Sequence, residues 1–96
     1  MSQLLRSISA WEDEIGKRIR QARKQRGLTQ QELADRANVS RSAIKALESG
    51  AGSTLSTFIG VVRALDLDET LDQIFATAST ISPLAMIKEA KRSRVR

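Results

Sequence analysis

The chain has 96 residues, enough for one small domain with tails, and it carries a net charge of +5. It contains neither Cys nor His, which excludes disulfides and Cys-based metal sites and removes the commonest general base and metal ligand. Without these side chains we expect that the protein is not an enzyme and uses no metal or other cofactor. No apolar run approaches the length of a membrane span and the N-terminus lacks a signal-peptide pattern, so we expect a cytoplasmic protein.

The charge is distributed unevenly. Residues 15–26 hold six basic residues and no acid, and residues 88–96 hold five basic residues and one acid. Residues 66–72 hold four acids and no basic residue. This polarity predicts a basic face for phosphates and an acidic opposite end.

Residues 1–11 are expected to form an N-terminal arm, in which Leu4, Leu5, Ile8 and Trp11 have the spacing of a short amphipathic helix. Trp11 either packs against the domain or a partner chain, or contacts a groove or a toxin. Both interpretations remain open from the sequence.

A first helix is predicted to begin at Glu12-Asp13-Glu14, because acids stabilise the positive end of the helix dipole. It has an inward stripe of Ile15, Ile19 and Ala22, and Gly27 ends it. Its basic residues cluster in part on one face, around Arg20, Arg23 and Lys24 with Lys17 beside them. This cluster is either a solvated face or a surface near phosphates.

Residues 29–49 have the pattern of two short helices joined by a tight turn. Thr29 and Glu32 form a capping box at the first helix. Asn38 tolerates the left-handed backbone that a sharp turn needs, Ser40 caps the second helix, and Gly50 ends it. Apolar residues recur on the inward faces: Leu33, Ala34, Ala37, Val39, Ile44 and Leu47.

Two further helices are predicted. Thr54 or Ser53 caps the first. Its apolar residues recur with the 3.6-residue period of a helix and are therefore expected in the core: Leu55, Phe58, Ile59, Val62 and Leu65. The second begins at residues 66–69 and carries an apolar stripe, part of which is surplus to the domain and suits a two-fold dimer contact: Leu67, Leu71, Ile74, Phe75 and Ala78. Residues 76–81 are predicted to be a linker, and Ser82-Pro83 starts a short helix followed by a basic end.

The run Gly27–Ala34, with Val39-Ser40 and Leu47–Gly50, resembles the lambda-repressor-like (Cro/repressor, XRE) helix-turn-helix family over roughly residues 12–68. The one departure is Asn38, where the family usually has Gly. The resemblance implies an all-α fold, a compact five-helix DNA-binding domain at residues 12–78 with its helix-turn-helix at 29–49. Residues 79–96 would then be a short helix and basic tail.

In such a fold the second helix of the motif lies in the major groove. We expect Arg41, Ser42 and Lys45 to contact bases, because an Arg guanidinium can bind guanine O6 and N7 together. The alternative is that Arg41 and Lys45 only solvate an exposed helix. From the family, Arg23 is expected to pair with Glu48, and phosphate contacts are expected from four residues: Gln30, Ser40, Ser49 and Arg23.

One such domain reads few base pairs, so we expect a homodimeric repressor on a palindromic double-stranded DNA operator, associated with the nucleoid. Thr54–Phe58, Ala64–Leu67 and Ser82-Pro83-Leu84 are also similar to HipB-type antitoxins. This similarity implies an autoregulating antitoxin of a HipBA-type system, with a HipA-type kinase toxin as partner. Two alternatives remain: a stand-alone phage- or host-type repressor, and a basic adaptor that binds protein or RNA.

Overall fold

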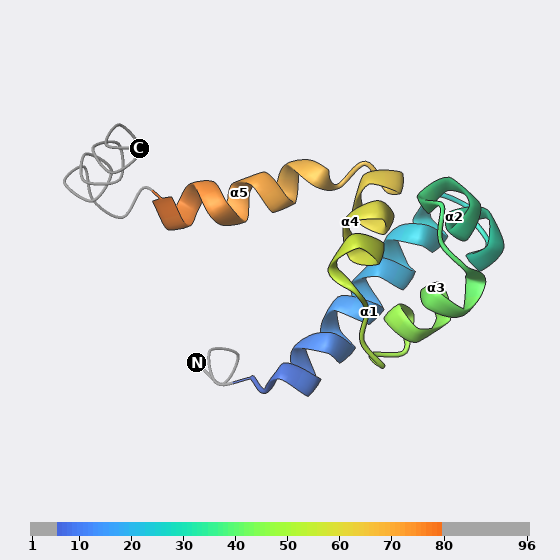
Figure 1. Ribbon diagram of the computed structural model, residues 1–96, viewed down its shortest axis with the longest axis horizontal. Helices are drawn as coiled ribbons and strands as arrows, with labels where there is room; N and C mark the ends of the chain where they lie inside the picture. The colour runs from blue at the N-terminus through green and yellow to red at the C-terminus, as the bar shows by residue number, and fades with distance from the viewer. Residues whose placement is uncertain (1–5, 80–96) are drawn as a thin grey trace, which may run out of the picture.

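The computed structural model describes residues 6–79, apart from the side chains of residues 77–79. Five α-helices fill most of this range: α1 (Ile8–Gln25), α2 (Gln30–Ala37), α3 (Arg41–Glu48), α4 (Leu55–Ala64) and α5 (Asp68–Ser79) (Figure 1). No strand occurs between residues 6 and 79, so the predicted all-α fold is confirmed. Within that range no helix is both long and apolar enough to cross a bilayer. The predicted C-terminal tail lies outside the described residues.

α1 begins earlier than predicted. The Ser7 hydroxyl accepts a hydrogen bond from the backbone N–H of Ala10 at 3.0 Å and caps the helix. The first turn therefore contains no acid, and Glu12 opens the second turn. A hydroxyl that satisfies a free N–H group determines a helix start more strongly than the screened attraction between nearby acids and the helix dipole. Trp11 thus belongs to α1, where the Arg6 guanidinium lies 4.5 Å from its ring centroid and the indole stays 42% exposed.

The next helix boundary follows the predicted signals. Gly27 adopts a φ of +68° just after α1, a conformation that glycine tolerates without strain. At α2 the backbone N–H of Thr29 donates to the Glu32 carboxylate at 2.9 Å, and the N–H of Glu32 donates to the Thr29 hydroxyl at 3.0 Å. The predicted capping box is confirmed. It gives α2 a defined first residue at Gln30.

The core lies where α2 packs on both α3 and α4, and α1 covers α3. Its largest fully buried side chains are Leu33, Ile44, Val61 and Leu65. Because each of these comes from α2, α3, α4 or the residue that follows α4, the core ties the helix-turn-helix to the rest of the domain.

The core predicted for α4 is partly wrong. Leu55 is 73% exposed and Ile59 is 38% exposed, whereas Val61, which was not predicted, is fully buried. α4 approaches α2 closely at Gly60, where an added Cβ would lie 3.0 Å from the carbonyl oxygen of Ala37. Val61 and Leu65 are four residues apart and share the fully buried side of the helix, whereas Ile59 lies about 200° around the helix from Val61 and therefore on the outer side.

α4 ends at Ala64, and two residues later Asp66 adopts a left-handed conformation, with a φ of 58°. The N–H of Leu67 then donates to the carbonyl of Val62 at 2.9 Å, which closes the helix end. α5 starts only at Asp68 and remains helical to Ser79, so the predicted linker at residues 76–81 is wrong for its first four residues.

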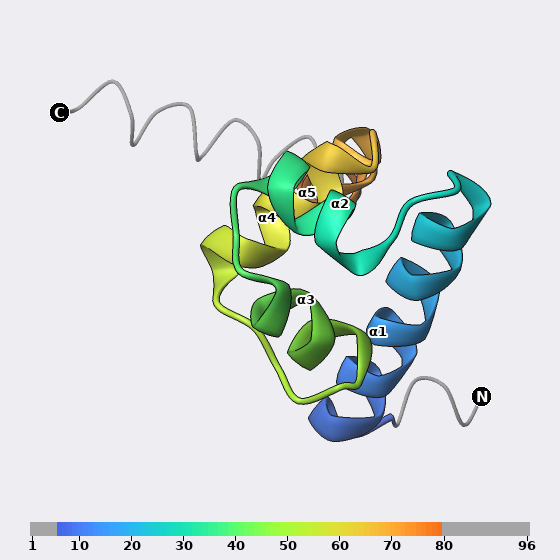
Figure 2. The ribbon, with the colours of Figure 1, turned by 90° about the vertical axis from the view of Figure 1, so that its right-hand side faces the viewer.

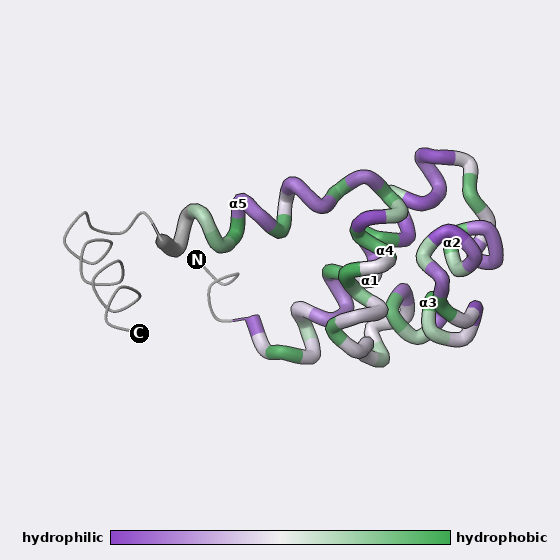
Figure 3. Tube along the Cα trace, turned by 45° about the horizontal axis from the view of Figure 1, so that its top comes forward, coloured by the Kyte–Doolittle hydropathy of each residue, from purple (hydrophilic) through white to green (hydrophobic). Residues whose placement is uncertain are grey.

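α5 leaves part of its apolar stripe uncovered, as predicted. Leu71 is half-buried, but Ile74 is 56% exposed and Phe75 is 70% exposed. The helix projects away from the side of the domain that α2 and α3 form (Figure 1). Hydrophobic and hydrophilic residues alternate along α5, which extends away from the other helices (Figure 3).

Candidate nucleic-acid interface

α2 and α3 form a helix-turn-helix on one side of the domain, which faces the viewer in Figure 2. Asn38 ends α2 in the predicted left-handed conformation, with φ 56° and ψ 47°. The N–H of Val39 donates to the carbonyl of Ala34 at 3.0 Å, and the Ser40 hydroxyl accepts from the N–H of Ala43 at 3.1 Å to cap α3. The turn is therefore fixed at one end by a backbone–backbone hydrogen bond and at the other by a side-chain cap.

The two faces of α3 differ sharply in burial. Ile44 is fully buried and Leu47 is 6% exposed, so they anchor the helix to the core. Arg41, Ser42 and Lys45 are all exposed. α3 consequently presents a polar, positively charged face to solvent from a fixed position.

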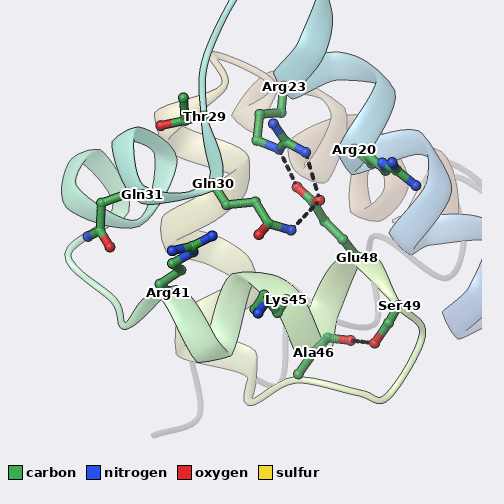
Figure 4. Close-up of a pocket in the computed structure, with 10 residues that line it drawn as sticks. All are labelled: Arg20, Arg23, Thr29, Gln30, Gln31, Arg41, Lys45, Ala46, Glu48 and Ser49. Carbon is green, nitrogen blue, oxygen red and sulfur yellow. Dashed lines mark hydrogen bonds and ion pairs between the residues drawn. The ribbon is translucent and has the colours of Figure 1, made fainter.

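An open hollow lies between this face of α3, the first turn of α2 and the C-terminal part of α1 (Figure 4). Four basic side chains and one carboxylate line it, together with five neutral residues: Arg20, Arg23, Arg41, Lys45, Glu48, Thr29, Gln30, Gln31, Ala46 and Ser49. The hollow thus brings together most of the predicted site residues, while Ser40 and Ser42 lie outside its lining. Its excess of positive charge suits a polyanion.

Arg23 and Glu48 form a buried ion pair at the back of the hollow. Arg23 Nε lies 2.6 Å from Glu48 Oε2, and Nη2 donates to Oε1 at 3.0 Å. A third bond runs from Arg23 Nη1 to the carbonyl of Leu28 at 2.8 Å. Because the Glu48 carboxylate accepts two of these hydrogen bonds, the pKa of Arg23 is raised, and the guanidinium keeps its charge. Arg23 is only 7% exposed, so the geometry favours a positioning role over the predicted phosphate contact.

Gln30 links the start of α2 to the end of α3. Its Nε2 donates to Glu48 Oε1 at 3.1 Å, and the side chain is half-buried in the wall of the hollow (Figure 4). Glu48 therefore receives hydrogen bonds from α1 and α2 at once. The carboxylate holds α3 against both helices.

The two serines predicted to contact phosphates already make hydrogen bonds within the chain. Ser40 only accepts, from Ala43, so its O–H remains available as a donor. Ser49 instead donates its O–H to the carbonyl of Ala46 at 3.1 Å. It can donate to a phosphate only after that bond is given up.

A helix-turn-helix family model matches residues 19–71, more than half of the chain. The chain belongs to the lambda-repressor-like (XRE) helix-turn-helix family. This membership assigns it the fold of a DNA-binding transcription regulator. A comparison with curated proteins gave no match.

Within this helix-turn-helix domain, sequence reasoning did not assign four residues of the hollow to the site: Arg20, Thr29, Gln31 and Ala46. The clearest omission is Arg20, which was placed only in the basic cluster of the first helix. Its spacing of three residues from Arg23, which puts both on neighbouring sides of α1, was the signal that could have identified it. Gln31 donates to Asp35 at 2.9 Å and lies at the outer edge of the same surface.

Proposed function

We propose that the protein is a sequence-specific repressor that binds a palindromic duplex as a homodimer and reads it with α3. The observation that carries this proposal is the contrast on α3, where Arg41 and Lys45 are exposed at the hollow while Ile44 and Glu48 are buried. A helix that is fixed on one side and cationic on the other is suited to entering the major groove.

In this proposal Arg41 reads a guanine through O6 and N7, and Lys45, one turn further along, reaches bases or backbone. Ser42 lies between them in the sequence and contacts a base or a phosphate. Gln30 and the free O–H of Ser40 contact phosphates, which set the register without specifying sequence. Ser49 adds a contact if its bond to Ala46 is exchanged for one to DNA.

The dimer is proposed to form through the uncovered stripe of α5. Ile74 and Phe75 are large, apolar and exposed, and burying them between two copies removes apolar surface from water. A two-fold dimer would place its two reading helices in successive major grooves, about 34–36 Å apart.

The test is selection of a binding duplex from a random-sequence library with the full chain, followed by titration of variants. Arg41→Ala should weaken binding to the selected duplex by about 1–3 kcal/mol and reduce its preference over mixed-sequence DNA. Arg36→Ala is the matched control, because Arg36 is also an exposed arginine but lines a different hollow. If Arg41→Ala binds as tightly and selectively as the control, α3 is not the reading helix.

The similarity of residues 54–67 to HipB-type antitoxins supports a finer proposal, an autoregulating antitoxin with a HipA-type kinase partner. Co-expression with the product of the adjacent gene, followed by purification through a tag on this chain, tests it. A kinase-like partner that co-purifies and tightens binding to the chain's own promoter supports the antitoxin. Binding to the promoter without any partner identifies a stand-alone repressor, and binding only to RNA or protein identifies an adaptor.

A further inference from the structure

Three basic side chains form a line on the outer face of α1, beside the reading hollow. Lys17, Arg20 and Lys24 are exposed and follow each other at spacings of three and four residues, which places them on one side of the helix. We call these three residues the α1 ridge. A second shallow hollow runs along it, lined by Lys17, Arg20, Gln21, Lys24 and Gln25.

Arg20 lines both hollows, so the α1 ridge is continuous with the basic surface around α3. Figure 4 shows Arg20 on α1, across the hollow from Lys45. The cationic surface of the domain is therefore wider than the reading helix and its immediate supports.

The charges of the α1 ridge are not used inside the domain. Elsewhere on α1, Arg18 pairs with Glu14 at 2.9 Å and Arg23 pairs with Glu48. Lys17 helps to lower the pKa of Glu14, but the main cause is the hydrogen bond from Arg18. Over residues 6–79, none of the three ridge side chains takes part in an ion pair or a hydrogen bond.

We propose that the α1 ridge binds backbone phosphates of the duplex beside the bases that α3 reads. From Lys17 to Lys24 the helix rises about 10 Å, which is enough for the three side chains to reach neighbouring phosphates of one strand. The hollow along the ridge is lined by Lys, Arg and Gln alone, so it supplies charge and amide donors without an apolar anchor. Protein interfaces depend on such anchors, whereas phosphate contacts do not.

This inference rests on the proposed function, since it assigns further contacts to the same duplex. Phosphate contacts give affinity that falls with salt but carry no sequence information. The α1 ridge therefore adds to the salt dependence of binding without affecting which sequence is preferred, whereas Arg41 contributes to that preference.

The test compares two double variants that each remove two positive charges. Arg20→Gln with Lys24→Gln changes the α1 ridge, and Arg36→Gln with Arg63→Gln changes two exposed arginines that line a different hollow. Affinity is measured by fluorescence anisotropy over a series of salt concentrations, on the selected duplex and on a mixed-sequence duplex. Thermal melts check that both variants remain folded.

For the ridge variant, the slope of log affinity against log salt should become shallower by about 1.8 on both duplexes, with the ratio of the two affinities unchanged. Adding Lys17→Gln should remove about 0.9 more. A ridge variant whose slope equals that of the control overturns the inference, even if Arg41→Ala still reduces sequence preference. If the wild-type chain shows no preference for any selected duplex, the proposed function itself fails, independently of the slopes.

Discussion

Removing the carboxylate of Glu48 tests how the reading helix is held. Three N–H groups lose their acceptor in Glu48→Ala: Arg23 Nε, Arg23 Nη2 and Gln30 Nε2. Breaking one partner of a buried ion pair typically costs about 3–5 kcal/mol, because the other charge is left unpaired. Arg23 keeps its bond to Leu28, and water can enter from the open hollow, so we expect about 3 kcal/mol.

The assay is urea unfolding followed by circular dichroism, with the free energy of unfolding extrapolated to water. Glu14→Ala is the control, since it breaks the ion pair with Arg18, whose side chain is 65% exposed, and should destabilise the fold far less than Glu48→Ala. Replacing both buried partners, Arg23→Met with Glu48→Met, removes the unpaired charge. That double variant should recover at least about 2 kcal/mol of the loss caused by Glu48→Ala.

Equal losses in Glu48→Ala and Glu14→Ala would refute the reasoning, because they would show that the buried pair behaves like a surface pair. A double variant as unstable as Glu48→Ala would also contradict it. Although its stability recovers, the double variant should bind DNA more weakly than the wild type, since Gln30 has lost the acceptor that holds it against α3.

Three further changes test other parts of the structure. Gly16→Ala should lower the free energy of unfolding by about 1–3 kcal/mol and weaken DNA binding, because the new Cβ would lie 2.5 Å from the carbonyl oxygen of Leu47 and displace α3; denaturation and anisotropy measure the two effects. Hydrogen bonds from the Thr29 backbone and side chain lower the pKa of Glu32 below its ordinary 4.5. The wild-type protein should therefore have a higher melting temperature than Glu32→Gln at neutral pH. That gap should close as the pH falls from 4.5 through the lowered folded pKa, and a gap that widens in acid would contradict the assignment. Leu33→Ala should cost about 2–5 kcal/mol in urea unfolding, whereas Leu55→Ala, at a 73% exposed position, should change stability by less than about 0.5 kcal/mol.

The sequence by itself determined the local features of the helix-turn-helix. The capping box at Thr29, the left-handed Asn38 and the cap at Ser40 were all predictable because each depends on residues within four positions along the chain. The regular spacing of apolar residues likewise predicted α5 and the part of its apolar stripe that the domain leaves uncovered. The pairing of Arg23 with Glu48 came only from the family resemblance, since the two residues are 25 positions apart.

Tertiary structure alone decided which sides of the helices meet. The packing of α4 on α2 buried Val61 in place of Ile59, and the pairing across α1 and α3 buried Arg23 while leaving Arg20 at the hollow. The start of α1 also shows the limit of local signals, because Ser7 caps the helix at Ile8 and the acids at residues 12–14 do not mark its beginning. Burial and charge neutralisation depend on segments that are distant in sequence, so residue patterns along one helix cannot specify them.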